Sequence, residues 1–575
     1  MNIRITRMYS ALCIFVVLAM ALAGATPQSV SASASTTSPN IVLILTDDQD
    51  LRLGSMEAMP STRALIGDQG MTMENFMVPN PLCCPARASL LRGQHAHNTQ
   101  ILYNTPPSGG FQRFLDLGHE DATVATALHA AGYRTALLGK YLNGYPSPDD
   151  PTHIPPGWDE WWVPVTDSAY SSYDYTVNDN GRLVSYGSQP QDYITDVIAG
   201  QAVEFISDTV TADPPSPFFL MVSVYAPHSP FVAAPRHTSW FSDTQMARAP
   251  NLNESDMSDK PPFMQAFPLL TPEDIASFDG YHRQRMQMLA AVDELVEDVI
   301  QALDAQGLLD NTYVVFASDN GYHMGQHRFM PGKGTPYEED TNVPLMVRGP
   351  GIPAGVVRND VGAIIDLAPT FAEIAGATLD VPSDGRSLLS LWGTSDPVPW
   401  RTGFLIEHWQ PPPVGKVDPR LALEAPDPFD LQLQELNLEN PDFRGIRTPD
   451  YKFIARLNNY ELYDIVNDPN EIYNQYSDAT PAFKTALQNW VTAQYECAGE
   501  SCQVADALPA PTWSLLYNRA DIDRDGHVGA LDVIHVAGCW KQIVAGECGD
   551  RNDLDYDGDI DVLDVLRVAA AFNES

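Results

Sequence analysis

Four short apolar runs constrain the fold of this chain more than any other feature. They read NIVLILT, PFFLMVSVY, TYVVFA and VPLMVR, at residues 40–46, 217–225, 312–317 and 343–348. Runs of this length that are almost entirely apolar are typical of strands buried on both faces of a sheet. Residues 285–306 instead carry their apolar side chains on one helical face. Strands that alternate with such helices predict an α/β fold with a largely parallel sheet.

Polar side chains follow three of these runs closely. Asp47 and Asp48 come after the first run, His228 after the second, and Asp319 and Asn320 after the third. Ligands of parallel sheets bind beyond the carboxyl ends of the strands, so we expect these side chains to meet there. Carboxylate and amide oxygens are hard ligands, which favour Ca²⁺, with Mg²⁺ as the alternative, over Zn²⁺. The pattern predicts an active site with a divalent cation.

The N-terminal residues have the order of a secretory signal peptide. Arg4 and Arg7 precede an apolar run from Ala11 to Ala23, and small residues and a Ser/Thr-rich stretch follow. We therefore expect a signal peptide over residues 1–25 and a secreted or periplasmic protein. A membrane anchor is the alternative interpretation, but the run is short for a bilayer. No other segment is apolar enough to suggest a membrane span after cleavage.

The cysteines of an exported chain need an explanation. Cys497 with Cys502, and Cys539 with Cys548, are close enough in sequence to form disulfides in an oxidising compartment. An adjacent pair at residues 83–84 has no such partner. Unless these two are simply buried as free thiols, one of them has a chemical task.

The C-terminal region carries a repeated calcium-loop pattern. DIDRDGHVGALD and DLDYDGDIDVLD place carboxylates at loop positions 1, 3, 5 and 12 and glycine at position 6. These are the oxygen ligands and the turn of a Ca²⁺ loop, and each loop runs into an apolar helix. The predicted ligands are Asp521, Asp523, Asp525, Asp532, Asp553, Asp555, Asp557 and Asp564. The repeat resembles a dockerin, which implies a small all-α calcium-binding module over residues 519–575 and a cohesin-like partner. Pro509 and Pro511 in an Ala-rich stretch predict a linker at 503–518.

The sequence around Cys83, PLCCPARASLLRGQ, resembles the sulfatase signature. Cys83 and Arg87 match the two ends of its Cys-x-Pro-x-Arg core. Further matching segments stand in the right order: residues 40–48, LGKYLNGY, PPGW, APHSP, SDNGYHMGQH and VPLMVRGPG. They are most similar to the N-acetylglucosamine-6-sulfatase group, which acts on heparan-type glycans. The resemblance implies an alkaline-phosphatase-like sandwich with a large mixed, mostly parallel sheet over residues 37–395, and a smaller C-terminal α+β subdomain over 396–502.

The resemblance also implies a particular use of Cys83. In the family a maturation enzyme oxidises this cysteine to formylglycine, whose hydrate carries two hydroxyl groups on one carbon. One hydroxyl attacks the sulfur of a sulfate ester and releases the alcohol, and loss of the other hydroxyl's proton then expels sulfate. A divalent cation lowers the pKa of the hydroxyl and screens the sulfate. The implied ligands of the cation are Asp47, Asp48, Cys83, Asp319 and Asn320.

Charged residues elsewhere in the chain acquire roles from the same resemblance. Arg87 would hold the formylglycine, and Lys140 and Lys333 would bind sulfate oxygens. His228 would contact the sulfate and give a proton to the leaving alcohol. The predicted substrate is a sulfated carbohydrate, of the glucosamine 6-sulfate type or a related polysaccharide. Weaker candidates for substrate contacts are His323, His327 and Asn143.

Two positions depart from the common sulfatase pattern. Arg92 stands where many members have threonine, in the region that guides the oxidising enzyme, so it could alter the conversion of Cys83. The alternative is that Arg92 belongs to a rim that binds polyanions. Leu142 stands where many members have histidine, which shifts the expected acid–base role toward His228 and His323. Aromatic residues that either stack on sugars or belong to the core are Trp158, Trp161, Trp162 and Tyr173.

The net charge and the motifs leave few other functions open. A formal charge of −41 argues against a nucleic-acid partner. A phosphomonoester or phosphonate hydrolase on the same fold is one alternative, although such enzymes usually carry Thr or Ser at the nucleophile position. A non-catalytic glycan-binding scaffold, docked through its C-terminus, is another. The motifs favour a sulfatase over both.

Overall fold

The computed structural model describes residues 38–211, 216–410, 427–438, 440–515 and 530–539, together with residues 554, 560 and 564–568. The predicted signal peptide, the end of the predicted linker and most of the calcium repeat lie outside this range. All elements named below belong to the unit formed by residues 39–575.

A ten-stranded mixed sheet organises the chain. Its strand order is β11-β2-β10-β9-β1-β8-β4-β5-β6-β7, in which the central strands from β9 to β5 are parallel. Antiparallel pairings begin on both sides of this parallel centre. The strands are β1 (Asn40–Thr46), β2 (Met71–Met73), β4 (Arg134–Gly139), β5 (Glu160–Pro164), β6 (Thr176–Asp179), β7 (Arg182–Ser185), β8 (Phe218–Ser223), β9 (Thr312–Ser318), β10 (Leu345–Arg348) and β11 (Val356–Arg358). Two short strands, β3 (Phe76–Met77) and β12 (Gly362–Ala363), pair separately.

The four predicted strands are confirmed as β1, β8, β9 and β10. β1 shows why an unbroken apolar run is needed at the centre of the sheet. Ile41, Leu43 and Leu45 point into one hydrophobic cluster, whereas Val42 and Ile44 point into a second cluster on the opposite face. Because successive side chains of a strand alternate between faces, a strand buried on both sides must be apolar at every position.

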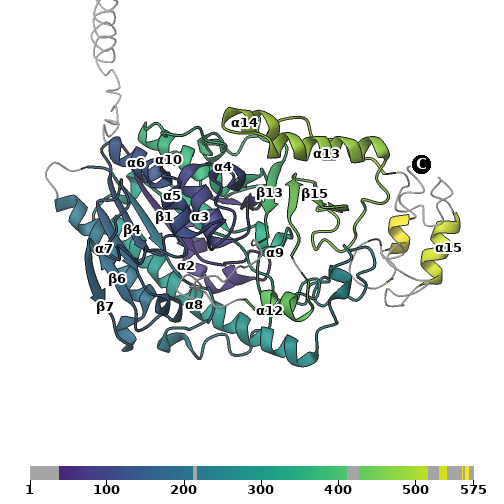
Figure 1. Ribbon diagram of the computed structural model, residues 1–575, viewed down its shortest axis with the longest axis horizontal. Helices are drawn as coiled ribbons and strands as arrows, with labels where there is room; N and C mark the ends of the chain where they lie inside the picture. The colour runs from purple at the N-terminus through teal and green to yellow at the C-terminus, as the bar shows by residue number, and fades with distance from the viewer. Residues whose placement is uncertain are drawn as a thin grey trace, which may run out of the picture. The chain divides into compact units, whose positions relative to one another are not determined.

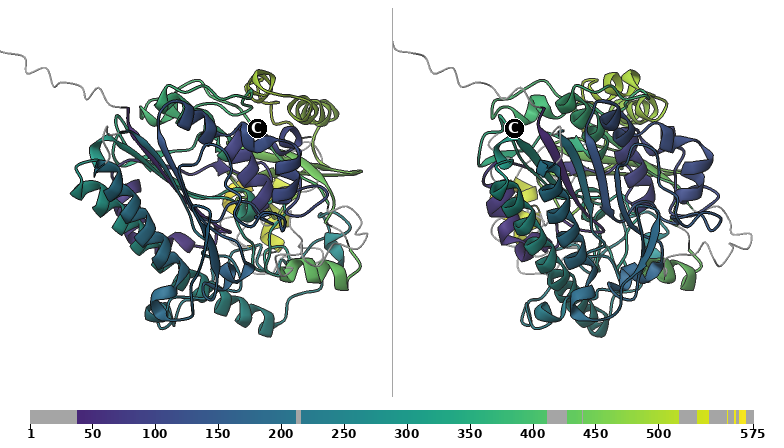
Figure 2. Two further views of the ribbon diagram at one scale, coloured as in Figure 1. Left: turned by 60° about the vertical axis from the view of Figure 1, so that its left-hand side comes forward. Right: turned by 90° about the vertical axis from the view of Figure 1, so that its left-hand side faces the viewer.

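Helices cover both faces of this sheet (Figure 2). On the face of Val42 lie α7 (Ile194–Thr211) and α8 (Pro272–Ala305), which pack against each other. On the opposite face lie α3 (Cys83–Arg92), α6 (Val124–Ala130) and α10 (Leu367–Ala375). Shorter helices are α2 (Pro60–Thr62), α4 (Ala96–Thr99), α5 (Gly110–Asp116), α9 (Glu338–Thr341) and α11 (Leu389–Trp392).

The long helix α8 begins well before the predicted start at residue 285. Thr271 is its N-cap, and the Thr271 hydroxyl accepts a hydrogen bond of 3.2 Å from the backbone N–H of Asp274. The carboxylate of Asp274 accepts a bond of 2.8 Å from the backbone N–H of Thr271, which completes a capping box. The prediction was wrong here because the first turns of α8 are largely exposed, so they carry no apolar stripe.

A second, smaller sheet forms the predicted C-terminal α+β region (Figure 1). Its strands β13 (Phe404–His408), β14 (Phe443–Arg447), β15 (Tyr451–Arg456) and β16 (Asn459–Asp464) are antiparallel neighbours. α13 (Pro481–Tyr495) packs Leu487 and Trp490 against Ile446 and Phe453 of this sheet. The remaining helices of the region are α12 (Pro428–Glu435) and α14 (Glu500–Asp506).

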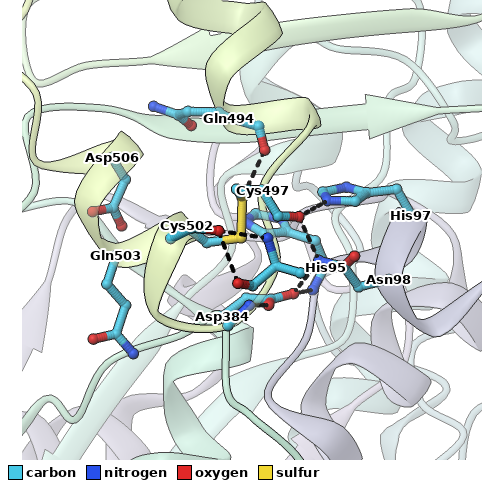
Figure 3. The surroundings of a disulfide bond; sticks show 12 residues. His95, His97, Asn98, Asp384, Gln494, Cys497, Cys502, Gln503 and Asp506 are labelled. Carbon is cyan, nitrogen blue, oxygen red and sulfur yellow. Dashed lines mark hydrogen bonds between the residues drawn. A yellow bond between two sulfur atoms is a disulfide. The ribbon is translucent and has the colours of Figure 1, made fainter.

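The predicted disulfide between Cys497 and Cys502 is confirmed, and it lies beside the start of α4 (Figure 3). The carbonyl of Cys497 accepts a hydrogen bond of 3.0 Å from the side chain of Asn98. The carboxylate of Asp384 accepts from the backbone N–H groups of His95 and Gly499, at 2.7 and 2.6 Å. These bonds fasten residues 497–499 to the loops around His95 and Asp384. Cys539 is also disulfide-bonded, and its expected partner lies outside the described residues.

Part of the predicted calcium repeat lies within the described residues. α15 (Ala530–Gly538) and the helical residues 564–568 contribute Val536 and Val568 to one small hydrophobic cluster. Of the predicted calcium ligands, only Asp532 and Asp564 are described, and both are buried. The six others lie outside the described residues, so the calcium loops stay a prediction. Across the described part of the chain, no helix is both long and apolar enough for a membrane span.

Candidate active site

The residues predicted for the active site meet at the carboxyl ends of the parallel strands. Asp47 and Asp48 directly follow β1, Asp319 directly follows β9, and His228 lies in the loop after β8. Cys83 opens α3 and points into the same place. All five side chains are buried. One ligand atom from each of Asp47, Asp48, Cys83 and His228 lies within 4.8 Å of the others.

Cys83 sits between carboxylates and a lysine. Its Sγ lies 3.3 Å from Asp47 Oδ1 and 3.7 Å from Asp48 Oδ1, and Lys333 Nζ lies 2.9 Å from it. Burial, and next the charge of Asp47, raise the pKa of the Cys83 thiol well above its ordinary value. An unmodified thiol here would stay protonated and would be a poor nucleophile. The surroundings of Cys83 therefore suit a group other than a thiolate.

Each carboxylate of the cluster has its own cation. Lys140 Nζ lies 2.6 Å from Asp47 Oδ2, and Lys333 Nζ lies 2.6 Å from Asp48 Oδ1. Burial by itself raises the pKa of both carboxyls, but the lysines and then His228 outweigh it, and the pKa of Asp47 and of Asp48 is lowered. Both carboxylates are thus held in their charged form.

The oxygen atoms of the cluster fit a hard cation. Asp48 Oδ2 and Asn320 Oδ1 are buried and accept no hydrogen bond within the described residues, although His228 Nε2 lies 3.5 Å from the former. Asn320 Nδ2 donates to Asp48 Oδ1 at 2.6 Å, which holds the two side chains together. Buried acceptors without partners cost free energy, and a cation would satisfy both. Asp47, Asp48, Asp319 and Asn320 supply the hard oxygens that Ca²⁺ or Mg²⁺ takes.

Arg87 joins the helix of Cys83 to the carboxyl ends of three strands, β8, β9 and β4. Its Nε lies 2.6 Å from Asp319 Oδ2, and its Nη1 donates to Ser223 Oγ at 2.7 Å and to the carbonyl of Lys140 at 3.0 Å. The guanidinium is 1 % exposed, so these bonds are protected from water. Ser223, the last residue of β8, was not predicted from the sequence, because a serine at a strand end has no distinguishing signal.

Arg285 is the main residue of the site that the sequence did not reveal. Its Nη2 donates to the carbonyl of Asp48 at 2.6 Å and to Asp50 Oδ1 at 2.8 Å, and its guanidinium lies 4.6 Å from the ring centre of Tyr322. It comes from α8 and holds the turn after β1. A signal existed, since Arg285 lies four residues before Leu289 on the apolar face of that helix. A cation on a buried face needs a partner.

His228 faces the cluster through one ring nitrogen. Its Nδ1 donates to the carbonyl of Ser229 at 2.6 Å, so Nε2 is the atom near Asp48. The ring of Tyr170 packs at a tilt against the imidazole, with ring centres 4.6 Å apart, and Lys140 Nζ lies 5.0 Å from the centre of the same tyrosine ring. Tyr170 was not predicted from the sequence. It fixes the position of two predicted site residues at once.

The weaker candidates lie around the cluster rather than in it. His323 Nδ1 lies 3.0 Å from the Asp340 carboxylate, and its buried Nε2 has no hydrogen-bond partner within the described residues. His327 Nδ1 lies 2.6 Å from Glu254 in a separate buried network, and burial lowers its pKa to about 3. Asn143 lines a small cavity of about 30 Å³ next to Lys140. Leu142 is buried in the hydrophobic core.

Two binding roles that the sequence left open do not fit the contacts of the residues concerned. The guanidinium of Arg92 donates to Gln94 Oε1 at 2.9 Å and to the carbonyl of Ala122 at 2.9 Å, and the residue is buried. A rim that binds polyanions is therefore wrong for Arg92. Trp161 and Trp162 are 1 % and 2 % exposed on β5 and belong to the core on opposite faces of the sheet. Neither is free to stack on a sugar.

Comparison with protein families agrees with the motif. The sulfatase family profile matches residues 39–377. The human N-acetylglucosamine-6-sulfatase is 34 % identical over 82 % of this chain and 87 % of that protein. An arylsulfatase of Chlamydomonas reinhardtii is 34 % identical over 86 % of this chain and 79 % of that protein. A Sulf-1 homolog of Caenorhabditis elegans is 38 % identical over 66 % of this chain, and this chain spans only 54 % of it.

Solved structures show the same fold at lower identity. A protein in complex with its substrate D-glucosamine-2-N,6-O-disulfate has a TM-score of 0.62, at 23 % identity over 83 % of this chain and 99 % of that one. The phosphonate monoester hydrolase of Agrobacterium radiobacter has a TM-score of 0.59, at 21 % identity over 80 % of this chain and 96 % of that one. These likenesses confirm the alkaline-phosphatase-like α/β fold. By profile and by its relatives, this chain belongs to the sulfatase family, the hydrolases of sulfate esters.

Proposed function

We propose that this protein hydrolyses sulfate monoesters on a sulfated carbohydrate of the glucosamine 6-sulfate type or a related polysaccharide. The observation that carries the proposal is the position of Cys83, with Lys333 Nζ at 2.9 Å and two carboxylates within 3.7 Å. The names of the relatives support the substrate class, since the human relative is an N-acetylglucosamine-6-sulfatase. The structural neighbour in complex with a glucosamine disulfate substrate supports it as well.

Cys83 acts in this proposal as a precursor, which a maturation enzyme converts to formylglycine. The hydrated aldehyde would supply an oxygen nucleophile that needs no thiolate. The raised pKa of the Cys83 thiol supports this, because the same surroundings disfavour a charged sulfur. Arg87 would orient the modified residue, because its own guanidinium is held in place by Ser223 at the end of β8 and by Asp319 directly after β9.

A cation held by the cluster and the two lysines would together offset the negative charge of the sulfate. Asp47, Asp48, Asp319 and Asn320 would hold a Ca²⁺ ion, or Mg²⁺, which supplies positive charge next to the sulfate oxygens. Lys140 and Lys333 would then bind further sulfate oxygens, because their ammonium groups already face the cluster. Preorganised charges in a buried site stabilise a developing anion without reorganisation.

His228 is the proposed proton donor to the leaving alcohol. Its Nδ1 donates to a carbonyl, which fixes the tautomer and leaves Nε2 toward the site. The carboxylate of Asp48 lies 3.5 Å from Nε2. His323, oriented by Asp340, is the second candidate. Asn143 and His327 are proposed only as contributors to the surroundings of the substrate.

The wider organisation of the chain is proposed on the sequence motifs. We place a signal peptide at residues 1–25, the catalytic domain at 37–395, its C-terminal subdomain at 396–502 and a linker at 503–518. The calcium-binding module at 519–575 would bind Ca²⁺ and a cohesin-like partner. Extracellular sulfatases among the relatives support a secreted or periplasmic location.

Mass spectrometry of the peptide that contains Cys83, together with sulfate release, tests the proposal. Protein made with a maturation enzyme should carry an aldehyde at Cys83 and release sulfate from glucosamine 6-sulfate. Cys83→Ala should release none, whereas the neighbouring Cys84→Ala should keep activity, because Cys84 belongs to the hydrophobic core. Active protein with an unmodified thiol would refute the mechanism.

A phosphonate monoester hydrolase is the second candidate, because structural neighbours have that activity on the same fold. An aryl phosphonate monoester distinguishes the two. Turnover of the phosphonate with a kcat/KM above that of the sulfate ester would favour the alternative. An unmodified Cys83 and no turnover of either would favour a glycan-binding scaffold.

A further inference from the structure

A cavity of about 920 Å³ lies in the C-terminal subdomain, outside the cluster around Cys83. Ligand sites in proteins typically occupy about 300–1,000 Å³. Its walls come from α13, from the turn between β15 and β16, and from the chain just after β13. Figure 1 shows α13, β13 and β15 close together. Aromatic residues line the cavity, namely Trp409, Tyr460 and Tyr495.

Arg444 supplies a positive charge to this cavity. On β14, Arg444 lies two residues before Ile446, so both side chains are on the same face of the strand. Ile446 packs against α13 in the hydrophobic cluster of this sheet, and Arg444 lies next to that cluster and lines the cavity. Its guanidinium lies 3.7 Å from the ring centre of Tyr495 and 5.9 Å from that of Trp409. Its Nε is buried and has no hydrogen-bond partner within the described residues. A guanidinium with spare donors in a concave, aromatic site suits a planar anionic group.

Two short connections lead from this cavity to the cluster around Cys83. Asn440 precedes the lining residue Pro441, and its side chain donates to the carbonyl of Gly334 at 2.8 Å, next to Lys333. On the other side, Leu102 lines the cavity, and Asn104 of the same loop accepts from the backbone N–H of Cys84 at 3.0 Å. Two segments that line the cavity are therefore hydrogen-bonded to the segments that carry Cys83 and Lys333.

We propose that this cavity is a second sugar-binding site, which holds an anionic unit of a polysaccharide while its sulfate ester lies at Cys83. Arg444 would pair with a sulfate or carboxylate of that unit, and Trp409 and Tyr495 would pack against the sugar faces. The inference rests on the proposed function and narrows it, because it makes a polymer, not a monosaccharide, the preferred substrate. Asp442 also lines the cavity, and its carboxylate accepts from the backbone N–H of Gln410 at 2.6 Å.

Sulfate release from two probes tests the proposal, namely a heparin-derived hexasaccharide and glucosamine 6-sulfate. The ratio of their kcat/KM values should fall about tenfold in Arg444→Ala, as expected for the loss of one charge-assisted hydrogen bond. Arg444→Lys keeps the charge but not the planar fork, so its ratio should fall less. The matched control is Arg182→Ala, an exposed arginine on β7, which should leave the ratio unchanged. A ratio in Arg444→Ala within about twofold of wild type overturns the inference.

Calorimetry separates this inference from the proposed function. Cys83→Ala protein should bind the hexasaccharide, and adding Arg444→Ala or Trp409→Phe should weaken that binding, again about tenfold for Arg444→Ala. Equal melting temperatures of the variants exclude unfolding as the cause. If wild-type protein releases no sulfate yet the hexasaccharide binds through Arg444, the proposed function fails and the binding site stands. If binding is indifferent to Arg444 and Trp409, the binding site fails.

Discussion

The ammonium group of Lys333 lies 2.9 Å from Cys83 Sγ. The same nitrogen lies 2.6 Å from Asp48 Oδ1, so one cation bridges the position of the nucleophile and a carboxylate of the predicted cation site. Lys333 comes from the long loop after β9, 250 residues beyond Cys83 in the chain. Because it is almost fully buried, its charge acts in a poorly screened environment.

Removal of the Lys333 charge should slow the chemical step. We expect Lys333→Met to lower kcat for sulfate esters about 10²–10³-fold, the range found for a preorganised group that stabilises a developing charge. Lys333→Arg should restore part of the activity. Lys484→Met is the control, because Lys484 lies on α13 and donates to the carbonyl of Ser477. Unchanged kcat in Lys333→Met, with Cys83 fully modified, would remove this lysine from the mechanism.

Removal of divalent cations should reduce both activity and stability. Chelation removes the cation that Asp48 Oδ2 and Asn320 Oδ1 would bind. We therefore expect a lower Tm and loss of sulfate release, both restored by Ca²⁺. Asp319→Asn should bind one cation fewer per chain, as measured by elemental analysis. The control is Asp298→Asn, on the partly exposed face of α8. Fully active protein with no bound divalent cation would contradict the predicted site.

Arg285 should matter for folding and for catalysis together. Arg285→Leu leaves the buried carboxylate of Asp50 without its cation, and breaking a buried pair in this way costs about 3–5 kcal/mol of unfolding free energy. The turn that carries Asp48 also loses its anchor, so kcat/KM should fall in whatever protein remains folded. Arg283→Leu, two residues earlier on α8, should cost less than about 1 kcal/mol. Equal stabilities of the two variants in chemical denaturation would argue against this role.

The pair of His97 and Glu407 should make stability depend on pH. Burial opposes the charge of His97, but Glu407, whose Oε2 lies 2.8 Å away, raises the pKa of His97 above its ordinary value. The contribution to stability is therefore complete below the unfolded pKa of about 6.5 and is lost as pH rises through the folded pKa. The Tm difference between wild type and His97→Gln should be largest near pH 6 and shrink above it.

The control for this pH dependence is His129→Gln. His129 is also close to a carboxylate, Asp159 at 3.2 Å, but it is 51 % exposed, so its pair should contribute little at any pH. A Tm difference for His97→Gln that stays constant from about pH 6 to pH 9 would mean that the pair is not charged as described.

Much of the fold and most of the site could be predicted from the sequence. β1, β8, β9 and β10 were visible because a strand buried on both faces must be apolar at every position. Their polar ends identified Asp47, Asp48 and Asp319, because parallel strands bring their carboxyl ends to one edge. The motif around Cys83 was visible because its spacing is local. All of these are short-range signals along the chain.

Only the tertiary structure decided which distant residues pair. Arg285 and Asp48 are 237 residues apart, and their bond depends on how α8 packs against the sheet. Other contacts between distant segments bury Arg92, place Trp161 in the core and bring Arg444 next to Trp409. A sequence records the periodicity and burial of each segment, but the partner of a buried charge is set by which segments meet in space.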